Sequence, residues 1–191
     1  MRPKKFYNPN MITVNGTNFI LLPPEGTSHC VGISSNQIVK IENFPHANKL
    51  RTLVEEAEVI QYLNSKGCKS CPFLVACGQL EDGRPYLVEQ RIIPRGKAVL
   101  GEILLAVFEQ KLLGVYQGDL HPRNIIFDGN KTYLIDYDQA IMDESIINME
   151  DAEFLYWISE QKIPAYVFEN QDLQNSYLEY VHLISHLPGY L

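Results

Sequence analysis

Three polar side chains with the chemistry of metal ligands and proton acceptors stand close together in the middle of the chain. Asp119 and Asn124 lie five residues apart, and Asp136 follows Asn124 by twelve residues. Between them, two short runs of β-forming residues flank Asp128-Gly129-Asn130, which is typical of a tight hairpin. Because a hairpin folds the chain back, we expect the three side chains to converge. Two carboxylates and a carboxamide oxygen suit Mg²⁺ that is also bound by phosphate oxygens.

The residues around this trio resemble two motifs of the protein-kinase-like fold. The stretch Gly118-Asp119-Leu120-His121-Pro122-x-Asn124 is similar to the catalytic loop of that fold. The stretch Leu134-Ile135-Asp136-Tyr137-Asp138 is similar to its metal-binding segment, and the two motifs occur in the expected order. The Gly-Asp-Leu-His-Pro form is typical of the branch that includes aminoglycoside and choline phosphotransferases and lipopolysaccharide core kinases. One residue departs from the pattern, because Gln117 occupies a position where a loop-supporting histidine is usual.

The resemblance implies a two-lobed α+β fold. We expect residues 1–191 to form a single kinase-like domain, with an N-lobe at 1–91 and a reduced, mainly helical C-lobe at 92–191. The N-lobe would contain an antiparallel sheet plus one helix, with the nucleotide-covering loop and the hinge. The C-lobe would carry the catalytic loop, and it is short because little sequence follows Asp138. Asp138 itself is expected to be a solvated surface residue, with a role toward the metal or the acceptor as the alternative.

The composition restricts the class of protein. The chain has 191 residues, of which 46% are hydrophobic, which is enough for a packed core. Its formal net charge of −7 argues against nucleic acid as the main partner, because phosphate backbones bind basic surfaces. No apolar run long enough for a signal peptide or a transmembrane span follows the basic N-terminus. We therefore expect a cytoplasmic protein whose four cysteines are reduced, and an effector exported by a non-classical signal is the alternative.

The first quarter of the chain predicts a sheet. Patterns of β-forming residues indicate strands at Met11–Val14, Phe19–Leu22, around Val31–Ile33 and at Gln37–Ile41. In the last of these, Ile38 and Lys40 share one face, because side chains alternate along a strand. The resemblance implies that Lys40 binds the α- and β-phosphates of ATP, although a lone lysine in a strand is more often a solvent-facing residue. Gly26 and Gly32 would belong to a phosphate-covering loop, and an ordinary hairpin explains them equally well.

A helix is predicted over Leu50–Ser65 from apolar residues at three- and four-residue steps. The resemblance implies that an acidic residue of this helix pairs with Lys40. Glu56 has the offset typical of kinase-like helices. We favour it over Glu55 and Glu58, although a solvated helix face would explain all three.

Two further strands are predicted at Pro72–Gly78 and Pro85–Gln90, joined by a turn. The end of the second strand resembles the hinge between kinase lobes. By that resemblance, backbone groups near Glu89 and Arg91 would bind the adenine edge, and Val88 would guard the pocket behind it. The residues themselves indicate only a half-buried strand.

The second half of the chain predicts mainly helices around the hairpin. Apolar stripes indicate helices over Gly96–Leu113, Glu150–Gln161 and Leu173–Leu187. Asp151 would brace the catalytic loop by resemblance, or it would be an ordinary first-turn aspartate favoured by the helix dipole. Cys68 and Cys71 lack the two further ligands of a structural zinc site, which favours buried or half-exposed thiols.

The function implied by the resemblance is that of a kinase, which uses ATP and Mg²⁺ to phosphorylate an acceptor hydroxyl. Asp119 would orient the acceptor and take its proton. Lys40, fixed by Glu56, would hold phosphates, and Asn124 and Asp136 would hold the metal. The absence of a long activation segment favours a saccharide or another small molecule as acceptor. Two alternatives remain open: a minimal atypical Ser/Thr protein kinase, and a pseudokinase that acts as a binding module.

Overall fold

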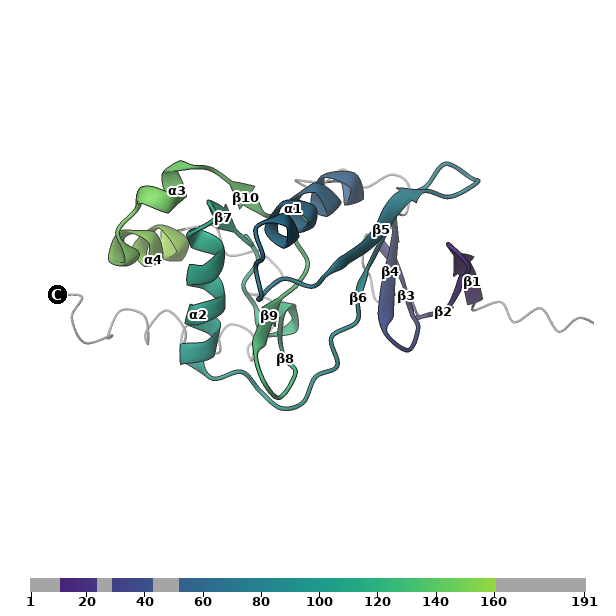
Figure 1. Ribbon diagram of the computed structural model, residues 1–191, viewed down its shortest axis with the longest axis horizontal. Coiled ribbons are helices and arrows are strands. Elements are labelled where there is room, and N and C mark those ends of the chain that lie inside the picture. The colour runs from purple at the N-terminus through teal and green to yellow at the C-terminus, as the bar shows by residue number, and fades with distance from the viewer. Residues whose placement is uncertain (1–10, 24–28, 43–51, 161–191) are drawn as a thin grey trace, which may run out of the picture.

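The computed structural model describes residues 11–23, 29–42 and 52–160. Their elements form two adjoining parts, namely a sheet with one helix and a smaller region of helices and short strands (Figure 1). This arrangement confirms the predicted α+β class with an antiparallel N-lobe sheet plus one helix. Gly26 and the helix predicted over Leu173–Leu187 lie outside the described residues.

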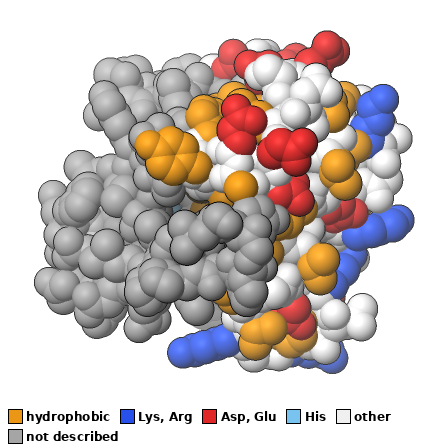
Figure 2. All heavy atoms as spheres, turned by 90° about the vertical axis from the view of Figure 1, so that its left-hand side faces the viewer, with side chains coloured by type: hydrophobic (Ala, Val, Ile, Leu, Met, Phe, Trp, Pro, Cys, Tyr) orange, Lys and Arg blue, Asp and Glu red, His pale blue; other side chains and the backbone are white. Residues whose placement is uncertain are grey.

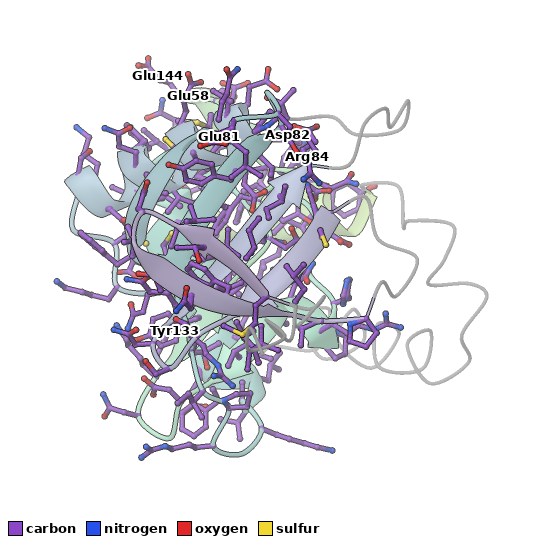
Figure 3. All side chains as sticks on the ribbon, turned by 90° about the vertical axis from the view of Figure 1, so that its right-hand side faces the viewer. Glu58, Glu81, Asp82, Arg84, Tyr133 and Glu144 are labelled. Carbon is purple, nitrogen blue, oxygen red and sulfur yellow. The ribbon has the colours of Figure 1, made fainter. Side chains whose placement is uncertain are left out.

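Six antiparallel strands form the first part, in the spatial order β1-β2-β3-β4-β6-β5. They are β1 (Met11–Val14), β2 (Thr17–Leu21), β3 (His29–Ile33), β4 (Gln37–Glu42), β5 (Leu74–Gln79) and β6 (Pro85–Gln90). Asn15 and Gly16 join β1 to β2 with positive φ angles of 49° and 77°, which a two-residue hairpin turn requires. At the β5–β6 turn, Arg84 and Asp82 form an ion pair of 2.7 Å and lie side by side at the top of Figure 3.

Alternation along β4 and β6 sends neighbouring side chains to two different cores. Lys40 pairs across the sheet with Leu87, and Val39 pairs with Val88. Leu87 packs in the cluster that contains α1, whereas Val39 and Val88 pack with Phe19 on the other face. Lys40 therefore lies on the α1 face of the sheet.

Gly32 belongs to the packing of this sheet and not to a phosphate-covering loop. It lies inside β3, opposite Val39. A Cβ at this position would lie 2.9 Å from Val39 Cγ1 and 3.0 Å from Phe19 Cβ. The prediction that Gly32 forms part of a loop over phosphates is wrong, because the close approach of these side chains requires a glycine within the strand.

Helix α1 (Leu53–Ser65) packs on the face of the sheet that carries Lys40. Thr52 is extended, and its side chain accepts a hydrogen bond from Glu55 N while the Glu55 carboxylate accepts one from Thr52 N. This capping box begins the helix at Leu53, three residues later than predicted. The buried side of α1 is apolar except for Glu56.

The second part of the molecule follows β6. It contains α2 (Leu100–Lys111), β7 (Val115–Tyr116), β8 (Ile125–Phe127), β9 (Thr132–Leu134), β10 (Ile141–Met142), α3 (Ser145–Asn148) and α4 (Asp151–Glu160). The predicted hairpin is present as β8 and β9, with Ile125 opposite Leu134. Helix α2 begins at Leu100 and not at Gly96, whose φ of 115° is incompatible with a helix. The β7–β10 pair and α3 were not predicted, because such short elements have no periodic pattern.

One continuous core joins the two parts. Leu63 of α1, Val107 of α2 and Phe154 of α4 belong to the same cluster of buried apolar residues. Within it, Tyr116 meets Phe154 and Trp157 edge-on, with ring centroids 6.3 and 5.3 Å apart. The shared core fixes α1 and the sheet relative to the residues that follow α2.

Figure 2 shows the side of the molecule that carries α2 and α4, where acidic side chains gather among apolar ones. Leu105 and Leu112 of α2 and Tyr156 of α4 are exposed. Among the residues that the structure describes, no helix is both long and apolar enough to cross a membrane. The acidic groups on this face agree with the net charge of −7.

Candidate active site

The loop between β7 and β8 carries the first group of candidate side chains. Gly118 has a φ of 89°, and a Cβ there would collide with the backbone oxygen of Gln139, so only glycine fits. This close approach holds the loop against the segment that follows β9. The loop then turns through a 3₁₀ helix, Pro122–Asn124, at whose start His121 Nδ1 accepts a hydrogen bond from Arg123 N.

Asp119 and Asn124 lie on this loop and contact each other. Asn124 Nδ2 donates 3.1 Å hydrogen bonds to both the backbone oxygen and Oδ2 of Asp119. His121 Nε2 lies 3.4 Å from the same Oδ2. Asp119 and Asn124 are both buried, with 8% and 5% exposure. Because Asn124 uses its amide nitrogen here, its Oδ1 is the atom that can serve as a metal ligand.

Lys40 is the centre of the second group. Its Nζ lies 2.6 Å from Oε1 of Glu56 on α1 and 2.9 Å from Oδ1 of Asp136 after β9. Burial opposes the charge, but the surrounding carboxylates outweigh it, Asp136 most, and hold the pKa of Lys40 well above its usual value. Lys40 in turn lowers the pKa of Asp136. The structure thus brings together a fixed cation and two carboxylates from three separate elements.

Glu56 is the glutamate of α1 that bonds to Lys40. Its side chain is fully buried, and its Oε1 accepts a hydrogen bond from Lys40 Nζ. Glu55 caps the helix, and Glu58 is exposed on the outer side of α1, near the top of Figure 3. The structure places Glu56 on the buried side of α1, because helical periodicity puts it on the same side as Leu53, Val59 and Ile60.

Asp136 has an unusual backbone conformation, with a φ of 64° in the left-handed region that few residues other than glycine adopt. The peptide that follows it is held at both ends. Gln117 Nε2 donates a 2.6 Å hydrogen bond to Asp136 O. Tyr137 N donates a 3.2 Å hydrogen bond to Glu56 Oε1. These two bonds hold the segment in the position where the Asp136 carboxylate reaches Lys40.

The donor chemistry of the site fits Mg²⁺ that arrives with a nucleotide. The described residues include no cluster of three or more His, Cys, Asp or Glu side chains arranged to hold a metal ion. Asn124 Oδ1 and the Asp136 carboxylate are hard oxygen ligands, and Mg²⁺ in nucleotide sites takes its other ligands from phosphates and water. Asn124 and Asp136 would thus supply two ligands to a metal ion that takes the others from a bound nucleotide and water.

At the end of β6, the side chains of Val88 and Glu89 lie on other faces of the sheet than the predicted hinge requires. Val88 packs with Val39 on the face of the sheet away from Lys40. Glu89, the next residue, lies on the Lys40 face, which is the position that the prediction gave to Val88. The correction follows from the strand register, since Glu89 stands opposite Ile38, which shares a face with Lys40.

Glu89 is a buried carboxyl group close to Lys40. It is 2% exposed, and its Oε2 has no hydrogen-bond partner among the described residues. Burial raises the pKa of Glu89 to about 7, although the charge of Lys40 acts in the opposite direction. The sequence assigned only the backbone of Glu89 to the site, so the setting of its side chain is new.

Arg91 directs its polar groups toward the turn between β3 and β4. Its backbone N–H donates to Asn36 O at 2.9 Å, and its Nη1 donates to Ser34 O at 2.7 Å. The backbone N–H that the prediction offered to an adenine edge is therefore already used. Binding of a base by Arg91 remains a prediction for its carbonyl oxygen alone.

Asp138 differs from expectation in its burial, and Asp151 differs in the residue that it contacts. Asp138 is half-buried, not solvated, and burial followed by the charge of Asp136 raises the pKa of Asp138 to about 7. Asp151 begins α4, and its Oδ1 accepts a 2.9 Å hydrogen bond from Lys111 Nζ at the end of α2. It thus links two helices, where the resemblance had placed it against the catalytic loop.

The cysteines agree with the thiol interpretation. Cys68 and Cys71 are buried free thiols, Cys30 is half-buried and Cys77 is exposed. Burial raises the pKa of Cys71 far above its ordinary value. Burial and a raised thiol pKa are the properties of unreactive core cysteines, which fits Cys71.

Gln117 is a residue of the candidate site whose contacts the sequence did not reveal. Its Nε2 donates hydrogen bonds of 2.7 Å to Ile135 O and 2.6 Å to Asp136 O. Its Oε1 accepts a 2.8 Å hydrogen bond from Asp119 N. The sequence marked the position because a histidine was expected, but only the structure shows that the amide joins the two motifs.

The comparisons with known proteins gave matches among solved structures, whereas no protein-family model and no curated protein matches the chain. The crystal structure of monomeric WbdD is 13% identical with a TM-score of 0.50, over 93% of this chain and 52% of that chain. WbdD is described as a bifunctional kinase-methyltransferase. A Stt7 homolog from Micromonas algae, soaked with ATP, is 16% identical with a TM-score of 0.51, over 69% of this chain and 54% of that chain.

This chain spans about half the length of those two structures. At such low identity the similarity concerns the fold. It agrees with the six-stranded antiparallel sheet that α1 covers on one face. The chain has the protein-kinase-like fold.

Proposed function

We propose that this protein is an ATP- and Mg²⁺-dependent phosphotransferase that moves the γ-phosphate to an acceptor hydroxyl. The observation that carries the proposal is the contact of Lys40 with both Glu56 and Asp136, in a chain whose Gln117 bonds to both Asp136 and Asp119. Phosphoryl transfer depends on positioning and charge neutralisation, and this arrangement supplies both. The kinase-methyltransferase WbdD and the Stt7 homolog soaked with ATP support nucleotide use.

Each residue of the site has one task in this reaction. Lys40, fixed by Glu56, binds the phosphates that are not transferred. Asn124 and Asp136 would hold Mg²⁺, which would neutralise charge on the phosphate oxygens. Asp119 orients the acceptor hydroxyl and takes its proton as the new bond to phosphorus forms. The bond from the γ-phosphorus to ADP breaks, and the products are ADP and a phosphate monoester.

The base of the nucleotide would lie against the end of β6 and the residues that follow it. Ile38 and Glu89 form the part of the sheet next to Lys40 on the same face. A nucleotide whose phosphates bind Lys40 would extend along this face. Gly26 and Arg91 remain predicted contributors to the nucleotide site.

The acceptor is proposed to be a saccharide or another small hydroxyl compound. Between Asp138 and α4 the chain forms only β10 and the one-turn helix α3. Such a short connection offers a peptide substrate little extended backbone on which to lie. A minimal Ser/Thr protein kinase and a pseudokinase are the alternatives that the following experiment separates.

The experiment begins with binding. The thermal unfolding midpoint would be measured with and without Mg-ATP, for the wild type and for Lys40→Met and Asp136→Asn. We expect Mg-ATP to raise the midpoint of the wild type and to act much less on the two variants. No stabilisation of the wild type would contradict the proposal.

Panels of candidate acceptors then distinguish a kinase that acts on saccharides or small molecules from a protein kinase. The wild type would be incubated with γ-labelled ATP and, separately, with saccharides, small alcohols and proteins. We expect label on a saccharide or a small alcohol. Label on protein alone would favour the protein kinase, and Mg-ATP binding without any transfer would favour the pseudokinase.

A further inference from the structure

Gln117 links the two halves of the proposed site through three hydrogen bonds. Its side chain is 1% exposed. Oε1 accepts from the backbone N–H of Asp119, and Nε2 donates to the carbonyl oxygens of Ile135 and Asp136. All three distances lie between 2.6 and 2.8 Å. The amide thus connects the catalytic loop directly to the segment that carries the metal ligand.

Only an amide of this length can make all three bonds. A primary amide has two N–H groups on one nitrogen and an acceptor oxygen, so one side chain bonds two carbonyl oxygens and one N–H. A neutral imidazole has one N–H and one acceptor nitrogen, and a histidine would keep two of the three bonds at most. A carboxylate would keep the bond to Asp119 N and lose both donors, and leucine would lose all three bonds.

The hydrogen bond from Gln117 to Asp136 O stabilises a backbone conformation that is unfavourable for a residue with a side chain. Asp136 has a φ of 64°, a conformation that a residue with a side chain adopts only when its surroundings impose it. Its carbonyl oxygen is held by Gln117, and the N–H of the same peptide unit, on Tyr137, is held by Glu56. The peptide is therefore clamped between the catalytic loop and α1.

We propose that Gln117 is a positioning residue, which holds the backbone of Asp136 in its metal-binding conformation and fixes it relative to Asp119. This role rests on the proposed function for its catalytic consequence, but the hydrogen-bond network stands independently of it. In this chain, the residue that departs from the family pattern completes the site. It replaces the usual histidine with a group that bonds both motifs.

A first experiment tests the network on the full chain without any ligand. Hydrogen exchange at the Asp119 amide would be compared in the wild type, Gln117→Leu and Gln117→His. Because Gln117→Leu removes the acceptor of that N–H, we expect its exchange to be at least about tenfold faster. Gln117→His keeps an acceptor nitrogen, and we expect it to restore part of the protection.

Gln110→Leu is the matched control. Gln110 is also a glutamine with 1% exposure, but its Nε2 donates to Tyr137 Oη and not to the catalytic loop. We expect Gln110→Leu to lower the unfolding midpoint about as much as Gln117→Leu, with no change at the Asp119 amide. Unchanged exchange in Gln117→Leu, or the same increase in both variants, would overturn the proposal.

A second experiment tests the consequence for the metal. The Mg²⁺ concentration that gives half-maximal ATP binding would be measured for the same variants. We expect Gln117→Leu to raise this concentration by about 10- to 100-fold, since a lost buried hydrogen bond corresponds to such a factor, while Gln110→Leu leaves it unchanged. If the wild type binds no Mg-ATP, the proposed function fails, and the exchange experiment alone decides the role of Gln117.

Discussion

Lys40 stands among more negative charge than it neutralises. Glu56 and Asp136 bond to it directly, and the buried carboxyl of Glu89 lies close enough to act on its pKa. Asp138 is also half-buried near Lys40, and burial together with the charge of Asp136 raises its pKa to about 7. A buried site with one cation and several carboxylates favours a bound metal ion or protons, which is the electrostatic basis of the proposed Mg²⁺ requirement.

Replacing Lys40 tests whether this cation binds phosphate. Lys40→Met removes the charge while keeping much of the volume, so we expect affinity for Mg-ATP to fall at least about tenfold. Calorimetric titration measures the affinity. Lys66→Met is the control, because Lys66 is exposed at the end of α1. Equal affinities of Lys40→Met and the wild type would remove Lys40 from the nucleotide site.

Glu89 gives a prediction for the pH dependence of stability. Its pKa is about 7 in the folded protein and near the ordinary value of 4.5 in the unfolded chain. The folded state therefore keeps a proton that the unfolded state loses between these values, and the free energy of unfolding falls as the pH rises through this range. This difference between the folded and unfolded pKa of Glu89 corresponds to about 3 kcal/mol of unfolding free energy, which is lost as the pH rises.

Glu89→Gln removes this titration. We expect urea unfolding of the variant to depend less on pH between about pH 5 and about pH 8 than that of the wild type, with the variant gaining stability at the higher pH. Glu58→Gln, on the exposed side of α1, should follow the wild type. A parallel decline of Glu89→Gln and the wild type would contradict the raised pKa.

At the scale of elements, local patterns predicted the parts of the site that a strand or a hairpin positions. Alternation placed Lys40 on one face of β4, and the turn at Gly129 predicted the β8–β9 hairpin. The resemblance, and not a local pattern, selected Glu56, which the structure places on the buried side of α1. Long-range packing decided the rest. The sequence could not show that Gly32 packs inside the sheet or that Glu89 and not Val88 faces Lys40, because both depend on strand register.

Gly118 tests how the catalytic loop is held. Gly118→Ala places a Cβ against the backbone oxygen of Gln139 in a conformation with a φ of 89°, so we expect a loss of about 2 kcal/mol or more of unfolding free energy. Gly101→Ala is the control, since Gly101 lies in α2 with open space around its Cβ position. For Gly101→Ala we expect the free energy of unfolding to rise by about 0.5–1 kcal/mol. Equal effects in urea unfolding would show that the loop relaxes around the new methyl group.

At the scale of the whole molecule, the shared core predicts that the two parts unfold together. Ile60 of α1 is fully buried in the cluster that also contains Phe154 of α4. Ile60→Ala should therefore lower the free energy of unfolding by about 2–5 kcal/mol for the entire described structure. Trp157, the single tryptophan of the chain, lies in α4 and reports on the second part by fluorescence.

The measurement compares Trp157 fluorescence with far-UV circular dichroism during urea unfolding. We expect one transition with coincident midpoints in the wild type, and an equal shift of both midpoints in Ile60→Ala. Val54→Ala, an exposed position on the same helix, should leave both midpoints nearly unchanged. A shift seen by circular dichroism alone would show that the sheet with α1 and the helical part are separate folding units, against the single domain that we predict.

The most direct test of the proposed chemistry is ATP turnover by wild type and Asp119→Asn in the presence and absence of Mg²⁺. Asp119→Asn keeps the size of the side chain while removing the proton acceptor, so ATP binding should persist. We predict Mg²⁺-dependent release or transfer of the γ-phosphate by the wild type, and a rate at least about a hundredfold lower for Asp119→Asn. Turnover that is unaffected by Asp119→Asn, or no turnover by the wild type with Mg²⁺ and the acceptor panel, would contradict the account.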